Sequence, residues 1–231
     1  ERFGVWTLGK LIVFEGIDGS GKSTQSALIK DRLKSEGIEF FPVTFPRYSE
    51  PSSALIRMYL GGEFGETPDS VNPYAASCFY AVDRYASYQI DWRQKYEAGG
   101  LIIADRYTTS NAIHQGSKLP ENERLDFFRW LYSFEFDLLK LPPPDAVFYM
   151  DTPLETALGR IRIRDAETGG GGDIHEKDLN YLEKCHLCGG QAAEEYGWIK
   201  IPAVKNGTVR TQQEVHEEIY SKIKEILKNE Q

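Results

Sequence analysis

A glycine-rich stretch near the start of the chain has the residue types and spacing of a phosphate-binding loop. Residues 16–23 read GIDGSGKS and fit the pattern G-x-x-x-x-G-K-[ST]. Glycines let backbone N–H groups converge on phosphate oxygens, Lys22 can reach the β- and γ-phosphates, and Ser23 offers a hydroxyl to Mg²⁺. The stretch therefore predicts a nucleoside triphosphate site with Mg²⁺. The residues predicted to bind the triphosphate are Gly16, Ile17, Asp18, Gly19, Ser20, Gly21, Lys22, Ser23 and Thr24.

A second candidate site lies where an apolar run ends in the residues Asp105, Arg106 and Tyr107. Ligands of open α/β sheets bind outside the carboxyl ends of the strands, so this site is expected to face the glycine-rich loop. We predict that Asp105 holds Mg²⁺ through water and that Arg106 clamps a phosphate with two hydrogen bonds. The alternative is an Arg–Asp surface pair that ends a strand.

Tyr80 and Arg84 are one helical turn apart in an aromatic-rich stretch and share a face. A ring and a guanidinium on one face can stack on a nucleobase and bind its edge. Many of the neighbouring aromatic residues must be core or interface, so the pair taken alone is more typical of a structural contact.

The elements that must position these residues alternate between strand and helix. Apolar runs at 11–15, 101–105, 146–151 and 198–201 predict strands buried on both faces, and Pro42 predicts that a fifth strand, within 39–45, lies at an edge. Helices are predicted from residue 22 to 35, from Pro73 to Gly99, after the capping box at 152–155, and after the one at 211–214. The order predicts a three-layer α/β fold of the P-loop type, with a five-stranded parallel sheet flanked by helices.

Composition narrows the classes of protein. The formal net charge of −8 disfavours sequence-independent nucleic-acid binding, and no apolar run approaches the about 18 residues of a membrane-spanning helix. Three cysteines predict a reducing compartment, the cytoplasm, and the pair Cys185 and Cys188 is interpreted as small helical residues rather than half of a zinc site. Residues 1–10 are taken as an N-terminal extension to one domain over 11–231.

Six segments together resemble the thymidylate kinases, a family of nucleoside monophosphate kinases. They read GIDGSGKSTQ (16–25), FPRYSEPSS (45–53), YAVDRYA (80–86), DRYTTSNA (105–112) and RIRIR (160–164), followed by a short loop before the C-terminal helix. The resemblance implies ATP-dependent phosphorylation of dTMP to dTDP with Mg²⁺, in a cytoplasmic homodimer. Kinases for another nucleotide, such as dUMP, or for a deoxynucleoside remain alternatives, as does an ATP-dependent switch or binding module.

The resemblance also implies how the acceptor is held. Asp18 stands where the family contacts the sugar 3′-hydroxyl, Arg47 and Tyr48 match the segment that approaches the acceptor phosphate, and Arg106 matches an arginine near that phosphate.

At the base, Tyr80 takes the place of a phenylalanine that stacks on thymine. Arg84 matches the arginine that reads O4, and Asn111 matches the residue near N3. His114 stands where many members have a tyrosine that excludes the ribose 2′-hydroxyl, which leaves the basis of deoxyribose selectivity open.

Gly19 stands where one subgroup of the family has a catalytic arginine, so the resemblance moves that role to a lid over about 160–176. Its arginines are Arg160, Arg162 and Arg164, and residues 169–172, all glycine, would form its tip. We therefore expect Lys22, Arg106, Arg160 and Arg164 to be catalytic through charge neutralisation, with no general base. The alternative for the arginines is a solvated helix face.

Overall fold

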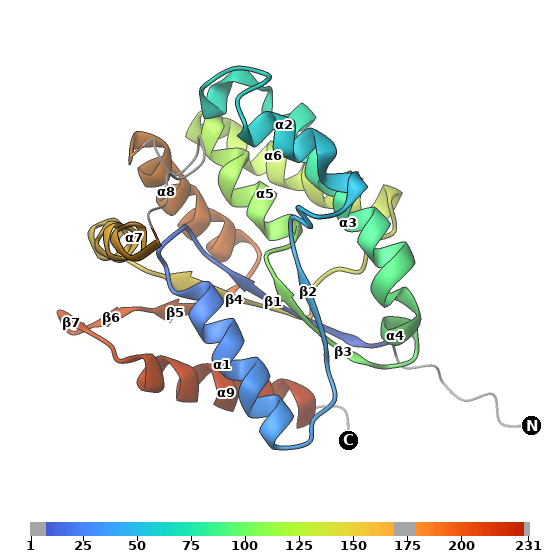
Figure 1. Ribbon diagram of the computed structural model, residues 1–231, viewed down its shortest axis with the longest axis vertical. Helices are drawn as coiled ribbons and strands as arrows, with labels where there is room; N and C mark the ends of the chain where they lie inside the picture. Colours follow the sequence, from blue (N-terminus) through green and yellow to red (C-terminus); the bar gives the residue numbers. More distant parts are fainter. Residues whose placement is uncertain (1–7, 169–178, 229–231) are drawn as a thin grey trace, which may run out of the picture.

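A computed structural model describes residues 8–168 and 179–228 of the 231-residue chain. Its central sheet contains β1 (Lys10–Glu15), β2 (Phe41–Thr44), β3 (Leu101–Asp105), β4 (Ala146–Asp151) and β5 (Ile199–Pro202). These strands lie in the order β2-β3-β1-β4-β5 and every pairing is parallel. The predicted five-stranded parallel sheet is confirmed, with β2 and its Pro42 at an edge (Figure 1). Lys10 already belongs to β1, so the domain begins before residue 11.

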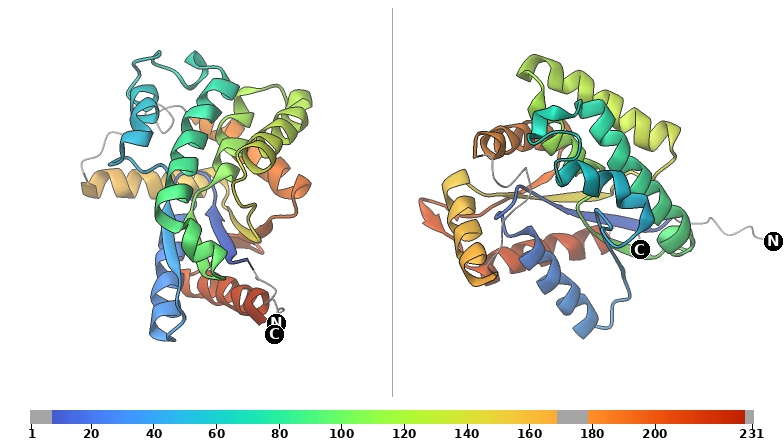
Figure 2. Two further views of the ribbon diagram at one scale, coloured as in Figure 1. Left: turned by 90° about the vertical axis from the view of Figure 1, so that its right-hand side faces the viewer. Right: turned by 45° about the horizontal axis from the view of Figure 1, so that its top comes forward.

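Helices cover both faces of the sheet. α1 (Lys22–Ser35) and α9 (Gln212–Lys228) lie on one face, where Ile29 and Ile219 pack against Ile12 and Phe14 of β1. The opposite face is covered by α3 (Pro73–Ser87), α5 (Thr108–His114), α6 (Glu121–Tyr132) and α8 (Leu179–Glu195), as Figures 1 and 2 show. Alternate side chains of β1 serve the two cores, because successive residues of a strand point to opposite faces.

The remaining elements connect these layers. They are α2 (Ala54–Leu60), α4 (Arg93–Glu97), α7 (Leu154–Thr168), short 3₁₀ turns at Pro51–Ser53, Pro68–Ser70 and Gly116–Lys118, and a hairpin of β6 (Val204–Lys205) with β7 (Thr208–Val209). The α7 helix lies at the end of the sheet where β1 and β4 finish (Figure 1). No helix within the two described stretches is long and apolar enough to cross a membrane.

Local signals set several helix ends as expected. The Asn72 side chain accepts a hydrogen bond from Tyr74 N at 2.8 Å and begins α3. Thr211 and Glu214 form a reciprocal capping box at the start of α9, with bonds of 2.8 and 3.2 Å.

The expectation of one regular helix from Pro73 to Gly99 was wrong in the middle. A π-helical turn over Tyr88–Trp92 separates α3 from α4. Within it, the rings of Tyr88 and Trp92 are both buried and pack edge to face at 4.7 Å. A second π-helical segment, Ser133–Leu138, follows α6.

Candidate active site

The phosphate-binding loop runs from β1 into α1. Gly16, Gly19 and Gly21 have positive φ angles of 149°, 74° and 94°, a region that side chains disfavour. A Cβ at Gly19 would lie 2.3 Å from Ala157 O, so only glycine allows the loop to pass this close to α7. Lys22 Nζ folds back over the loop, 3.3 Å from Ile17 O and 3.1 Å from Asp18 Oδ1.

A cleft of about 310 Å³ opens on the acceptor side of this loop. It brings together residues predicted from four separate parts of the sequence. They are Asp18, Lys22, Ser23, Tyr48, Tyr80, Arg84, Arg106, Asn111 and His114. We call this cavity the acceptor cleft.

Arg106 is the central cation of the acceptor cleft. It has a φ of 63°, a strained conformation for a residue other than glycine, which turns the side chain back toward the loop. Its guanidinium is ion-paired with Asp18, and its Nη1 lies 3.0 Å from His114 Nε2 and 3.7 Å from Glu15 Oε1. Burial opposes the charged form, but Asp18 and Glu15 raise the pKa of Arg106, which remains a cation.

Asp18 is held as a carboxylate. Burial alone would raise its pKa, but Lys22, Arg106 and His114 together hold the pKa of Asp18 well below its usual range. The pKa of Lys22 is lowered, because burial and the neighbouring Arg106 outweigh the attraction of Asp18 and Glu15. The loop and the acceptor cleft thus share one cluster of interlocked charges.

Glu15 belongs to this cluster and was not predicted. Its side chain is fully buried, accepts a hydrogen bond from Gly16 N at 2.9 Å, and accepts two more from Thr109 Oγ1 and Ser110 Oγ at 2.8 and 2.7 Å. It therefore ties the loop to α5. A carboxylate at the end of an otherwise apolar strand was the signal that could have found it.

Two further residues near Arg84 and Asn111, where the nucleobase is expected, were not predicted either. Gln115 is 1% exposed and lines the cleft, and neither atom of its amide has a hydrogen-bond partner in the described part of the chain. Glu135 is fully buried and forms an ion pair with Arg84. Asn111 Nδ2 donates to Ser77 O at 3.2 Å.

The structure does not bring Arg47 to the acceptor cleft. Its Nε lies 3.2 Å from Asp83 Oδ1, its Nη1 lies 2.6 Å from Asp91 Oδ2, and its Nη2 lies 2.9 Å from Ser52 Oγ. These partners belong to α3, the π-helical turn after it and a 3₁₀ turn. Arg47 thus anchors the loop after β2, while the neighbouring Tyr48 reaches the cleft.

Asp105 pairs with Lys30 rather than with Arg106. Lys30 Nζ lies 2.6 Å from Asp105 Oδ2, while Asp105 Oδ1 is buried with no hydrogen-bond partner in the part of the chain that the structure describes. That carboxylate oxygen and the Ser23 hydroxyl are the oxygen donors that Mg²⁺ prefers, so these residues fit the ion.

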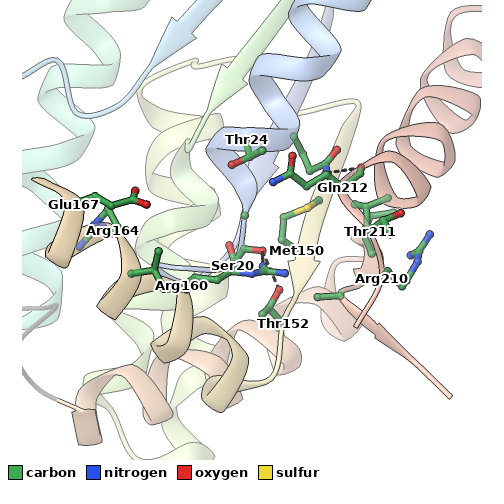
Figure 3. A pocket seen from close by; sticks show the side chains of 16 residues that line it. Ser20, Thr24, Met150, Thr152, Arg160, Arg164, Glu167, Arg210, Thr211 and Gln212 are labelled. Carbon is green, nitrogen blue, oxygen red and sulfur yellow. Dashed lines mark hydrogen bonds between the residues drawn. The ribbon is translucent and has the colours of Figure 1, made fainter. Parts of the chain in front are cut away.

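A second cavity, of about 400 Å³, lies on the other side of the loop and is called the donor cavity here (Figure 3). Ser20, Gly21 and Thr24 line it, with Arg160 and Arg164 from α7 and Thr211 before α9. Figure 3 shows Arg160 beside Ser20, where Arg160 Nη1 and Thr152 Oγ1 donate to Ser20 O at 2.9 and 3.0 Å.

Two of the three predicted lid arginines line the donor cavity. Arg164 lines it further along α7 than Arg160 and pairs with Asp165 at 2.9 Å, whereas Arg162 is exposed and is not among the lining residues. Residues 169–176 of the predicted lid, with its glycine tip, lie outside the described residues.

Cys185 and Cys188 form a buried helical pair on α8, packed against α5. Cys185 Sγ lies 3.5 Å from His114 Nδ1 and 3.3 Å from Ser117 Oγ, and Cys188 Sγ donates to Ala112 O at 3.3 Å. Burial raises the pKa of each thiol to about 12. The two cysteines therefore form part of the wall behind the acceptor cleft.

A parallel sheet with a phosphate-binding loop between two cavities defines a P-loop phosphotransferase that takes a nucleoside triphosphate and a second, anionic ligand. The family model of the thymidylate kinases matches residues 14–219. The chain belongs to the thymidylate kinase family.

Individual relatives are similar over most of their length. The thymidylate kinase of Mycobacterium tuberculosis is 31% identical over 191 residues, which are 81% of this chain and 87% of that protein. The thymidylate kinase of Prochlorococcus marinus is 28% identical over 226 residues, 96% of this chain and 99% of that protein. The structure of thymidylate kinase from Candida albicans matches with a TM-score of 0.69 and 22% identity, over 94% of this chain and 92% of that one, and supports the fold.

Proposed function

We propose that this protein transfers the γ-phosphoryl group of ATP to dTMP and releases dTDP and ADP. The observation that carries the proposal is the position of the phosphate-binding loop between the two cavities. Ser20, Gly21 and Thr24 line the donor cavity, while Lys22 and Ser23 line the acceptor cleft. A phosphoryl group bound at this loop is therefore within reach of a ligand on either side.

Charge neutralisation is the main chemical task of this site. The acceptor phosphate has a second pKa of about 6 and is largely dianionic at neutral pH, so no general base is required. Lys22 and Arg106 supply positive charge on the acceptor side, and Arg160 supplies it on the donor side. Asp18, which stays ionised, accepts a hydrogen bond from the sugar hydroxyl.

The end of the acceptor cleft away from Lys22 and Arg106 recognises the base. Tyr80 stacks on the pyrimidine, and Arg84 donates to a carbonyl oxygen. Asn111 and Gln115 bind the polar edge of the ring. The unpartnered amide of Gln115 supports this assignment, because a buried amide without a partner is unfavourable unless a ligand completes its hydrogen bonds.

Mg²⁺ bound with ATP would neutralise the phosphates. Ser23 and Asp105 are the residues that would hold it. Support comes from the oxygen-donor chemistry of these two side chains and from Asp105 Oδ1, which is buried without a hydrogen-bond partner among the described residues.

A homodimer is also proposed, formed through α3 and the π-helical turn after it. Val82, Tyr85 and Ile90 are 55%, 42% and 78% exposed there, more than large apolar side chains favour in a monomer. The three free cysteines agree with a reducing location such as the cytoplasm. Sedimentation of the wild type and of Ile90→Asp tests the dimer, and a monomeric wild type would contradict it.

Detection of the products tests the proposed reaction. ATP, Mg²⁺ and dTMP are incubated with the protein and separated by anion-exchange chromatography. We expect dTDP and ADP in equal amounts, and no phosphorylation of thymidine, which lacks the phosphate that Arg106 binds. ADP formed without dTDP would contradict the proposal.

A further inference from the structure

Glu135 lies in the π-helical segment after α6 and makes a two-point contact with Arg84. Arg84 Nε donates to Glu135 Oε2 at 2.7 Å, and Arg84 Nη2 donates to Oε1 at 2.5 Å. Arg84 is 1% exposed and Glu135 is fully buried. We infer that Glu135 is a positioning residue that aims Arg84 at the base carbonyl and thereby sets which pyrimidine the acceptor cleft selects. This inference rests on the proposed function.

The carboxylate of Glu135 is itself fixed in place. Thr108 Oγ1, at the start of α5, donates to Oε2 at 2.7 Å. On either side of Glu135 the rings are packed, with Phe134 stacked on Trp130 at 5.3 Å and Phe136 stacked on Tyr107 at 6.4 Å. A π-helical turn shifts the direction of side chains relative to a regular helix, and such turns are frequent at functional sites. The segment therefore holds Glu135 from both flanks.

The contact with Glu135 leaves the Nη1–Nη2 edge of the Arg84 guanidinium for a ligand, because the Nε–Nη2 edge faces Glu135. Nη1 also donates to Tyr107 O at 3.4 Å, and Arg84 still lines the acceptor cleft. Because the pair carries no net charge, this end of the cleft suits a neutral hydrogen-bond acceptor, such as a carbonyl oxygen, rather than a phosphate. The guanidinium cannot rotate without breaking both bonds to Glu135.

A role in stability alone would explain the pair poorly. Two charges removed from water rarely stabilise a fold more than apolar residues of similar size would, so a buried ion pair is weak evidence for a stabilising role. A fixed guanidinium edge has a direct use in a cleft that must distinguish a carbonyl from an amino group. A site built to hydrogen-bond one group rejects an analogue that leaves the site unpaired.

The test compares two acceptors whose bases differ at C4 and, as a consequence, in the hydrogen on N3. dTMP has a carbonyl at C4, and 5-methyl-dCMP has an amino group there, with the same methyl group and sugar phosphate. Their dissociation constants are measured by isothermal titration calorimetry for the wild type and for Glu135→Gln. A glutamine keeps the size, but Arg84 donates to both carboxylate oxygens of Glu135, so in either orientation the NH₂ group of the glutamine faces an N–H of Arg84 and Arg84 loses its fixed position. We expect the preference for dTMP to fall about tenfold, with the affinity for an ATP analogue unchanged.

Two further variants keep the test decisive. Asp145→Asn makes the same chemical change at the far end of β1, where Asp145 binds Lys10 Nζ and Leu11 N, and should leave the preference intact. Thr108→Val removes one donor to Glu135 and should reduce the preference for dTMP by a smaller factor. If Glu135→Gln does not fold, the preference of Thr108→Val is compared with that of the wild type instead. An unchanged preference in the folded variants, or a wild type that binds neither acceptor, would overturn the inference.

Phosphorylation of dTMP by the wild type is measured in parallel, so the two proposals can fail separately. A wild type that prefers dTMP in binding but produces no dTDP would contradict the proposed reaction alone. An active wild type whose preference survives Glu135→Gln would contradict the positioning role alone.

Discussion

The acceptor cleft and the donor cavity flank the same loop but are built differently. Around the acceptor cleft, buried charged side chains form ion pairs and hydrogen bonds with one another. Arg84, Glu15 and Glu135 are at most 1% exposed, and Arg106 is paired with Asp18. Around the donor cavity, side chains bond mostly to backbone carbonyls, as Arg160 does to Ser20 O and Gln25 does to Gln212 O.

This difference has a chemical meaning. Fixed, buried charges can distinguish one acceptor from another, because a wrong acceptor leaves them unpaired. Backbone groups of a phosphate-binding loop hold any triphosphate in the same way. Substitutions around the acceptor cleft should therefore change which acceptor is chosen, and substitutions around the donor cavity should change the rate for every acceptor.

The largest effect is expected at Lys22, which joins the two sides. Lys22→Ala should reduce kcat/KM by about 10³-fold or more, because the variant lacks the cation at the transferring phosphate. Lys34→Ala, an exposed lysine on the same helix, is the matched control in a coupled ADP-release assay. A loss of less than tenfold in Lys22→Ala would place the transferred group elsewhere.

Arg160 should show the donor-side pattern. Arg160→Ala should lower kcat about 10²-fold with little change in the KM for dTMP, because the arginine neutralises charge in the transition state rather than binding the acceptor. Arg162→Ala, exposed on the same helix, should leave kcat nearly unchanged. A raised KM with normal kcat would assign Arg160 to acceptor binding instead.

Substitution of Gln115 should weaken binding of the acceptor and at the same time make the folded protein more stable. Gln115→Met keeps the size of the side chain and removes an amide that has no partner among the described residues. We expect the KM for dTMP to rise about tenfold, while the free energy of unfolding without ligand increases by about 1 kcal/mol. Urea denaturation and initial rates measure the two quantities. Lower stability with an unchanged KM would make the amide structural.

The smallest effect concerns the wall behind the acceptor cleft. Burial raises the pKa of Cys188 from 9.0 to about 12. Between these values the folded protein keeps a proton that the unfolded chain releases, so this contribution to stability is present below pH 9 and is lost as the pH rises toward 12. The slope reaches about 1.4 kcal/mol per pH unit.

Cys188→Ala should therefore flatten the fall in stability between pH 9 and pH 10.5. Urea midpoints at several pH values measure that fall. Cys78→Ala is the control and should flatten the fall less, because Cys78 is only partly buried and the pKa of its thiol is raised by a smaller amount. Parallel profiles for the wild type and Cys188→Ala would show that the thiol does not titrate in this way.

The parts of the molecule that could be predicted from the sequence are those with local signals. The glycine-rich loop, the α1 helix and the capping box at Thr211 depend on residues close together in the chain, and the structure has them where they were predicted. The strand interrupted by Pro42 lies at the sheet edge, because proline cannot donate to a second neighbour.

The residues that escaped prediction depend on contacts between distant segments. Arg47 was expected at the acceptor phosphate, but it forms ion pairs with Asp83 and Asp91, and no spacing in the sequence predicts that pairing. Glu135 meets Arg84 only because a π-helical turn directs it inward, a feature that apolar periodicity does not signal. Gln115 gives no signal until burial shows that its amide has no partner.

The account is tested most directly by acceptor selectivity in one assay. ADP release with ATP and Mg²⁺ is measured against dTMP, dUMP, ribo-TMP, 5-methyl-dCMP, dGMP and thymidine, and kcat/KM is compared. The account predicts the highest value for dTMP, with 5-methyl-dCMP and dGMP far below it. Equal values for these three, or ADP release that needs no acceptor, would contradict an acceptor cleft built to select a thymine nucleotide.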